Sequence, residues 1–235
     1  MFDLVDLSRP LETSMPHART IPAASFTQVR SWDEHHMRAM RLDMPTHIGT
    51  HLDAPSHFVE DGGTIEDVPL STLIGPAYCV QVLRDGPRPV TAADLTSALS
   101  AAGVELTAGD ALLIHTGWDE RYHTQDYVDK HAYLSVDGAQ WCADQGLRLV
   151  GFDTITPEYP MGLRPPNFHH EVHGALLGAG TLIVENLVLG GVADQWMTLF
   201  VGALLVRGGD GAPARVLAIK HGAAREPTTK VSNGQ

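Results

Sequence analysis

The chain has 235 residues, of which 43% are hydrophobic and 19% charged, and its formal net charge is −12. This length and composition predict one globular domain with a substantial core, which we place at residues 1–224, followed by a disordered polar tail at 225–235. The acidic balance, without a cluster of lysine or arginine, argues against binding to nucleic acid or to an anionic membrane.

The cysteines and the first ten residues bear on the compartment. Cys79 and Cys142 each lie in an apolar stretch, which argues against a disulfide scaffold and against a cysteine-ligated zinc site. Residues 1–10 (MFDLVDLSRP) lack the basic and apolar regions of a secretory signal, and the chain has no run of about 18 apolar residues. We therefore expect a cytoplasmic protein without a membrane-spanning segment.

The predicted elements follow a long irregular segment. The first 75 residues, rich in proline and glycine, are too irregular for a parallel-sheet unit. A capping box at Thr91-Ala-Ala-Asp94 predicts the start of a helix, and further helices are predicted at 136–145 and 173–177. Short apolar runs rich in β-branched residues predict strands at 77–83, 110–116, 147–153, 181–184, 197–206 and 215–220. Strands alternating with short helices predict an α/β or α+β fold.

The 13 histidines are unevenly distributed, and one group of them predicts a metal site. The segment 45–58 (PTHIGTHLDAPSHF) has four side chains suited to metal binding or proton transfer, all at odd positions: His47, His51, Asp53 and His57. In an extended chain they share one face. A helical alternative is disfavoured because Gly49 and Pro55 would interrupt the helix.

A straight strand would hold these side chains too far apart. At about 3.3 Å per residue, His47 and His51 would be about 13 Å apart, whereas metal ligands lie about 2.0–2.2 Å from the ion. The chain must therefore curl, and Gly49 and the turn-forming sequence Asp53-Ala-Pro55 permit this. Two imidazoles and one carboxylate suit Zn²⁺ or Mn²⁺ and leave coordination positions open for water.

A second group of residues lies in the later part of the chain. His173 opens a predicted helix that leads into the strand at 181–184, and Glu185 is the only charged residue in the apolar run TLIVENLVL. A buried carboxylate is costly unless it is paired or bound to a metal. Glu185 is therefore predicted either to face the metal, with His173 beside it, or to form an ion pair with an arginine such as Arg164 or Arg207.

The other histidines give weaker signals. His169 and His170 are interpreted as surface residues or as neighbours of the ligands. His115, at the end of a predicted strand, is interpreted as structural in preference to a metal ligand. No spacing argument applies to the rest, which are His17, His35, His36, His123, His131 and His221.

Two motifs carry a resemblance to a known family. Residues 47–57 read HIGTHLDAPSH, and a later element reads HGALL at 173–177 followed by VENL at 184–187. Both are similar to motifs of the cyclase family of metal-dependent hydrolases, which includes bacterial kynurenine formamidases and isatin hydrolases. The likeness extends from DLSRP at 6–10, through TGW at 116–118 and GFDT at 151–154, to GAPAR at 211–215.

The resemblance implies a single-domain α/β (α+β) fold of the swivelling β/β/α type, assembly into homodimers or homotetramers, and amide hydrolysis at one or two divalent metal ions, Zn²⁺ or Mn²⁺. Carried over residue by residue, it implies that His57 is the catalytic acid/base. The implied metal ligands are His47, His51, Asp53, His173 and Glu185. The proline-rich segment 155–166 matches no family pattern, which leaves the substrate open.

We therefore expect a metal-dependent hydrolase that cleaves the C–N bond of an aryl formamide, similar to N-formylkynurenine, or of a small cyclic amide. A divalent ion lowers the pKa of bound water from 15.7 towards about 7, and His57 is placed to move the proton. Asp53 is the expected bridge if two ions bind. Two alternatives remain: His47, His51 and Asp53 could hold Fe(II) in a non-haem oxygenase, or the site could bind metal without turnover.

Overall fold

The apolar runs in the middle of the chain form a set of parallel strands. The structure, a computed structural model, describes residues 3–220, so the predicted tail at 225–235 and His221 lie outside the described residues. Four neighbouring strands run parallel: β5 (Ile74–Gln81), β7 (Ala111–His115), β9 (Leu149–Phe152) and β10 (Leu182–Glu185).

Antiparallel strands close this sheet into a barrel. β11 (Gln195–Ala203) pairs with β5 on one side and with β12 (Gly211–Lys220) on the other. The short strand β4 (His51–Asp53) pairs with both β10 and β12, which completes a ring within residues 3–220 in the order β12-β11-β5-β7-β9-β10-β4. β1 (Leu4–Asp6) adds to the free part of β12.

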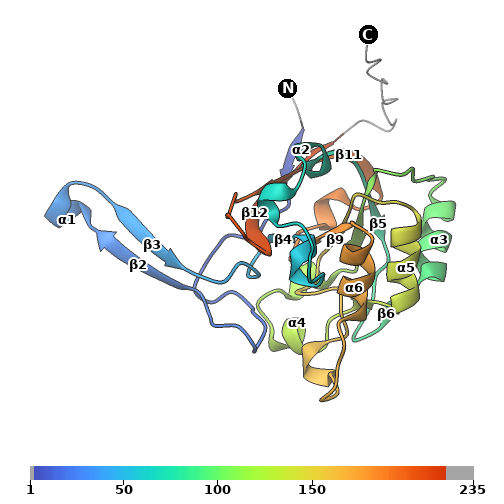
Figure 1. The fold of residues 1–235 in the computed structure, drawn as a ribbon, viewed down its shortest axis with the longest axis horizontal. Coiled ribbons are helices and arrows are strands. Elements are labelled where there is room, and N and C mark those ends of the chain that lie inside the picture. The colour runs from blue at the N-terminus through green and yellow to red at the C-terminus, as the bar shows by residue number, and fades with distance from the viewer. Residues whose placement is uncertain (1–2, 221–235) are drawn as a thin grey trace, which may run out of the picture.

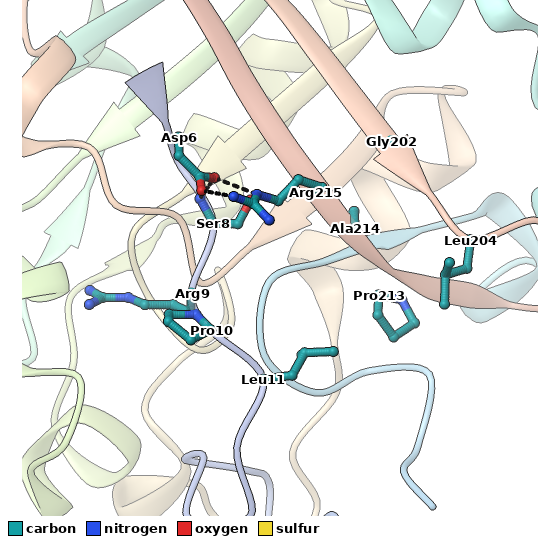
Figure 2. A pocket seen from close by; sticks show the side chains of 10 residues that line it. All are labelled: Asp6, Ser8, Arg9, Pro10, Leu11, Gly202, Leu204, Pro213, Ala214 and Arg215. Atoms are coloured by element: carbon teal, nitrogen blue, oxygen red, sulfur yellow. Dashed lines mark hydrogen bonds and ion pairs between the residues drawn. The ribbon is translucent and has the colours of Figure 1, made fainter. Parts of the chain in front are cut away.

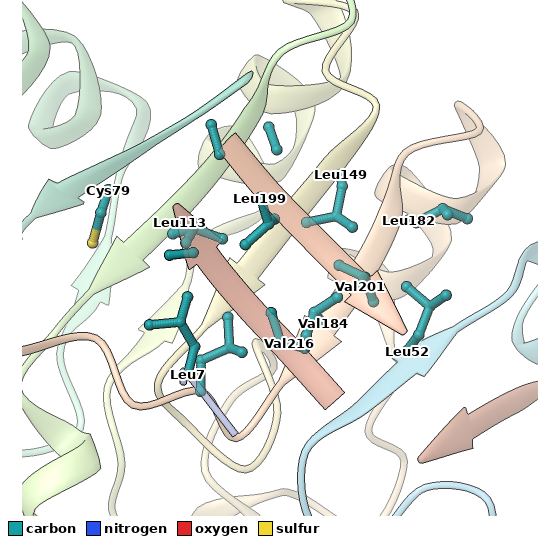
Figure 3. Packing of buried hydrophobic residues seen from close by; sticks show 14 of the residues in the cluster. Leu7, Leu52, Cys79, Leu113, Leu149, Leu182, Val184, Leu199, Val201 and Val216 are labelled. Atoms are coloured by element: carbon teal, nitrogen blue, oxygen red, sulfur yellow. The ribbon is translucent and has the colours of Figure 1, made fainter. Parts of the chain in front are cut away.

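The barrel interior is the main hydrophobic core. Alternate residues of each strand point inward, for example Leu113 of β7, Leu149 of β9 and Val184 of β10, and all are fully buried. Figure 3 shows these side chains meeting Leu199, Val201 and Val216 from the antiparallel strands. Helices cover the opposite face of the parallel strands, so β7, β9 and β10 are buried on both faces and read as continuous apolar runs in the sequence.

Three helices cover the outer face of the parallel strands on one side of the barrel (Figure 1). They are α3 (Ala92–Ala101), α5 (Val136–Asp144) and α6 (Glu171–Gly178). The capping box predicted for the first of them is confirmed, because Thr91 Oγ1 accepts a hydrogen bond from Asp94 N while the Asp94 carboxylate accepts one from Thr91 N. Their apolar sides pack against Val80, Leu112 and Ile183 of the sheet.

The smaller elements fill the connections. They are the helices α2 (Leu70–Leu73) and α4 (Gln125–Asp129), the paired strands β6 (Pro89–Val90) and β8 (Tyr133–Leu134), and the 3-10 turns η1 (Pro55–His57), η2 (Ile65–Asp67), η3 (Trp118–Arg121), η4 (Met161–Leu163) and η5 (Gly190–Val192).

One hairpin leaves the body of the molecule. β2 (Ser25–Arg30) and β3 (Ala39–Asp43) pair with each other and are joined through the short helix α1 (Trp32–His35). We call residues 25–43 the arm; Figure 1 shows it projecting away from the barrel. Its apolar side chains are exposed, namely Val29, Trp32, Met37, Met40 and Leu42.

The predicted strands are all present, with shifted ends. The strand predicted at 197–206 ends at Ala203, and the one predicted at 215–220 begins at Gly211 because Gly211–Pro213 pair with β4. The first 75 residues contain short antiparallel strands that the sequence did not predict. The sequence predicted only that this segment would not form a parallel-sheet unit. Cys79 and Cys142 are buried and free. Among the described residues, no helix is long and apolar enough to cross a membrane.

Candidate metal centre

The predicted curl at Gly49 brings two histidines together. Residues 47–50 form a bend in which Gly49 has φ +63°, a left-handed conformation that glycine adopts readily. The ring centroids of His47 and His51 are consequently 5.2 Å apart. Asn186 fixes the bend, since its Nδ2 donates to the Gly49 carbonyl at 2.9 Å.

Strand pairing then brings Glu185 to the same place. Asp53 of β4 pairs with Ile183 of β10, and His51 pairs with Glu185. Leu52 and Val184 point into the barrel core, so His51, Asp53 and Glu185 lie on the outer face of the sheet. His173, from α6, packs over that face.

Four side chains converge there with their donor atoms facing one another. His51 Nε2 lies 3.3 Å from Asp53 Oδ1 and 3.3 Å from Glu185 Oε2. His173 Nε2 lies 3.3 Å from Glu185 Oε1 and 3.7 Å from Asp53 Oδ2. Each carboxylate thus presents one oxygen to each histidine, and all four residues are at most 5% exposed.

These spacings fit a divalent metal centre. Two ligand atoms at about 2.0–2.2 Å from a tetrahedral ion are about 3.3–3.6 Å apart, which is close to the spacings observed here. Asp53 Oδ2 is buried and has no hydrogen-bond partner among residues 3–220. Asp53 also belongs to two groups of possible ligands, one with His47 and His57 and one with His51 and Glu185, whose ligand atoms lie within 4.8 Å of one another. The residues present therefore suit one ion or a bridged pair.

Neighbouring groups fix the orientation of both buried imidazoles. His51 Nδ1 donates to the Gly49 carbonyl at 2.8 Å, and His173 Nδ1 donates to Glu158 Oε1 at 2.9 Å. The same Glu158 oxygen accepts the backbone N–H of His173 at 2.9 Å. Because each Nδ1 proton is held by an acceptor, each Nε2 faces the carboxylates, and it could bind a metal once its own proton is displaced.

The carboxylates of this cluster favour positive charge on its two buried histidines. Burial lowers the pKa of His51 and His173, but the carboxylates beside them raise it further, to about 9 and about 10 respectively. Although burial raises the pKa of Asp53, the histidines around it hold that pKa well below its usual range. A divalent ion would displace these protons, so metal binding and proton release are coupled here.

His47 sits at the edge of the cluster. Its Nδ1 lies 2.8 Å from Asp53 Oδ1, and its Nε2 lies 3.0 Å from Asp210 Oδ2. The ring lies against Gly211 of β12, where a Cβ atom would be 2.4 Å from His47 Cε1. Only glycine leaves room for this imidazole.

His57 differs from the other histidines of the site. It lies in η1, and its ring stacks on His47 with centroids 3.7 Å apart. Burial, together with the nearby His47 and His173, lowers its pKa to about 4, below the value near 6.5 of a free imidazole. The ring is therefore neutral at pH 7. Its Nδ1 is 3.4 Å from Asp210 Oδ2, which leaves Nε2 for other chemistry.

A small pocket of about 250 Å³ is lined by five residues of this site, namely His47, His51, His57, His173 and Glu185. Its walls include Thr20 and Ile21 from the segment before the arm, Phe58 after η1, and Ile155 and Arg164 from the proline-rich segment. The volume lies below the ~300–1,000 Å³ typical of sites for drug-sized ligands. A larger groove of about 370 Å³ beside Asp6 and Arg215 contains none of the candidate ligands (Figure 2).

The alternative prediction was that Glu185 forms an ion pair with an arginine. Within residues 3–220 it forms none, and its carboxylate contacts His51 and His173 instead. Of the two other histidines on this segment, His169 is exposed, and His170 is half-buried and lines the pocket. His115 is buried in a separate group with Asp119 and Asp153. It does not line this pocket.

The sequence did not point to Glu158 or Asp210. Glu158 comes from the proline-rich segment and Asp210 from the loop before β12, and neither has a spacing relation to the histidine motif. Asp210 precedes a glycine and reads as an ordinary turn residue. The sequence feature that could have indicated Glu158 is that it is a single carboxylate among apolar and proline residues.

Fold and donor set together define a class: a single-domain α/β protein with a candidate divalent-metal centre on the outer face of its barrel. A model of the family described as putative cyclase matches residues 5–159, and the chain belongs to this family. The kynurenine formamidase of Salinibacter ruber is 31% identical over 219 residues, which cover 91% of this chain and 96% of that protein.

Solved structures of related proteins have a similar fold. A potential metal-dependent hydrolase with cyclase activity is 29% identical, with a TM-score of 0.74 and coverage of 97% of this chain and 100% of that one. Isatin hydrolase A from Ralstonia solanacearum, at 20% identity, has a TM-score of 0.83 and coverage of 94% and 92%, which supports the fold. The expected family and fold class are confirmed, and the chain is a metal-dependent hydrolase.

Proposed function

We propose that this protein hydrolyses the C–N bond of an amide, either an aryl formamide similar to N-formylkynurenine or a small cyclic amide similar to isatin. The observation that carries the proposal is the His57 ring beside the buried cluster of His51, Asp53, His173 and Glu185, with all of these side chains except Asp53 lining one small pocket. The relatives named kynurenine formamidase and isatin hydrolase support this substrate class.

The metal would be held by His47, His51, Asp53, His173 and Glu185. Imidazole and carboxylate ligands without a thiolate favour Zn²⁺ or Mn²⁺. The two oxygens of Asp53 face different histidines, so this carboxylate is suited to bridge two ions. When bound, such an ion lowers the pKa of a water molecule and polarises the substrate carbonyl.

His57 would move the proton that this reaction requires. Its ring is neutral at pH 7, so Nε2 can accept a proton from the attacking water and return it to the leaving nitrogen. Asp210, at 3.4 Å from Nδ1, would orient the ring and stabilise it while it is protonated. A site that only stored metal would not need this arrangement. Nor does any described residue favour the oxygenase alternative, since five donors are available in place of three.

The test combines elemental analysis with a substrate screen. Purified protein should contain Zn²⁺ or Mn²⁺, and metal-loaded protein should hydrolyse N-formylkynurenine, formanilide or isatin. Chelation should abolish the activity, and the same metal should restore it. Less than about half an equivalent of divalent metal per chain, with no activation by added metal, would refute the proposal; oxygen consumption with Fe(II) would favour the oxygenase.

We also propose that the protein forms homodimers or homotetramers in the cytoplasm. The arm supports assembly, because an isolated two-stranded hairpin is marginally stable in water and this one exposes five large apolar side chains. A second copy would cover them. Light scattering should give an oligomeric mass for the wild type and a smaller mass for a Met40→Lys, Leu42→Lys double variant. A monomeric wild type contradicts the proposal.

A further inference from the structure

Among the described residues that line the candidate active-site pocket, Arg164 is the only arginine and there is no lysine. It follows η4 and precedes Pro165 and Pro166, so its backbone is held in an extended conformation with φ −65° and ψ 133°. The family model that matches this chain covers residues 5–159, so Arg164 lies just beyond the matched part.

Three contacts fix the guanidinium in place. Its Nε donates to the Tyr159 carbonyl at 2.7 Å, and its Nη1 lies 3.3 Å from His170 Nε2. The group also lies over the Phe168 ring, with Cζ 4.6 Å from the centroid. The side chain is thus ordered before any ligand binds, which reduces the entropy lost on binding.

The remaining donor of this side chain, Nη2, is left without a partner. This atom is buried and has no hydrogen-bond acceptor among residues 3–220. Leaving a charged donor unsatisfied in the protein interior is costly. Five other arginines of the described residues form an ion pair with an aspartate, namely Arg19, Arg41, Arg84, Arg121 and Arg215.

The neighbouring acids do not supply the missing acceptor. The charges of Glu158 and Glu185 act on Arg164 and raise its pKa, while burial lowers it more. Yet Glu158 is hydrogen-bonded to His173, and Glu185 contacts His51 and His173. Both carboxylates are thus directed at the candidate metal centre, and Nη2 needs an acceptor from elsewhere.

We propose that Arg164 binds a carboxylate on the substrate, so that the preferred substrates are one-ring aryl amides that carry an acidic group. A guanidinium forms stronger, charge-assisted hydrogen bonds with a carboxylate than with a neutral carbonyl. The pocket volume of about 250 Å³ limits the substrate to roughly a single ring with its substituents. This inference rests on the proposed amide hydrolysis and specifies its substrate class.

The test compares matched ligands that differ in the acidic group. Wild-type enzyme loaded with metal should hydrolyse 2-formamidobenzoate with a KM at least about tenfold below that for formanilide. Arg164→Gln should raise the KM for 2-formamidobenzoate about 10- to 100-fold and leave that for formanilide nearly unchanged. The KM of Arg164→Lys for 2-formamidobenzoate should lie between those of the wild type and Arg164→Gln. Arg121→Gln, a substitution at a partly exposed arginine outside the pocket, is the control and should change neither constant.

A second measurement does not depend on turnover. Calorimetry on chelator-stripped protein should show 2-aminobenzoate binding more tightly than aniline, with the difference lost in Arg164→Gln. Metal content and melting temperature of each variant establish that it is folded.

Each outcome bears on one proposal. If the wild type hydrolyses no amide, the proposed function fails. If it hydrolyses formanilide as well as 2-formamidobenzoate, or if Arg164→Gln affects both substrates equally, the function stands and the carboxylate inference is overturned. Equal binding of 2-aminobenzoate and aniline to the wild type also overturns it.

Discussion

Replacing Gly211 with alanine tests whether the position of His47 matters for the metal centre. The added Cβ would lie 2.4 Å from His47 Cε1, whereas ordinary contacts of a Cβ atom begin at 3.4 Å. The imidazole must therefore shift by the difference, 3.4 − 2.4 = 1.0 Å. Catalytic geometry tolerates about 0.5 Å, and a displacement of about 1 Å can reduce the rate about 10²-fold.

The same Cβ also approaches the backbone, at 2.9 Å from the Leu52 carbonyl oxygen. Overpacking of this kind destabilises a protein by about 1–3 kcal/mol, which corresponds to a fall in melting temperature of about 2–12 °C for a domain of this size. We therefore expect Gly211→Ala to fold at 20 °C, to retain less metal after dialysis, and to lose about 10²-fold in kcat/KM.

Gly174→Ala is the matched control, because Gly174 is adjacent to His173 in α6 and a Cβ there would meet nothing within 4 Å. Alanine in a helix should stabilise the protein by about 0.5–1 kcal/mol and leave metal content and activity intact. Elemental analysis, thermal melting and amide-hydrolysis rates at 20 °C give the comparison. A Gly211→Ala variant with wild-type metal content and activity would refute the assignment of His47.

The remaining predictions concern the proposed base, the buried carboxylate and a helix terminus. His57→Ala should keep its metal and lose about 10²–10⁴-fold in rate, whereas His51→Ala should lose both; a fully active His57→Ala, or one that has lost its metal, contradicts the assignment. Glu185→Gln should lower the melting temperature more in metal-loaded than in chelator-stripped protein, and an equal fall in both forms would make the carboxylate structural. Partial burial raises the pKa of Asp94, but hydrogen bonds from Thr91 and Arg84 lower it to about 2. Its contribution, about 1 kcal/mol at pH 7 after allowance for solvent screening, should be lost as the pH falls from about 4 through 2, so urea titrations of wild type and Asp94→Ala should differ at pH 7 and converge near pH 2.

The sequence by itself determined the features that depend on nearby residues. The motif at 47–57 could be interpreted because alternation along an extended chain is a local property, and Gly49 marks the bend that the motif needs. The capping box at Thr91 and the apolar runs of β5, β7, β9 and β10 were likewise readable from neighbouring residues. Glu185 stood out because it was the single charge in a run suited to burial.

Only the tertiary structure decided how distant segments complete the site. The closure of the barrel pairs β4 with both β10 and β12, which places Gly211 under His47 and His51 opposite Glu185. Glu158 and Asp210 reach the cluster from segments far along the chain, where no local pattern records the contact. Strand pairing and the convergence of side chains depend on residues far apart in the chain. From the sequence alone, Glu158 and Asp210 are therefore interpreted as ordinary turn or loop residues.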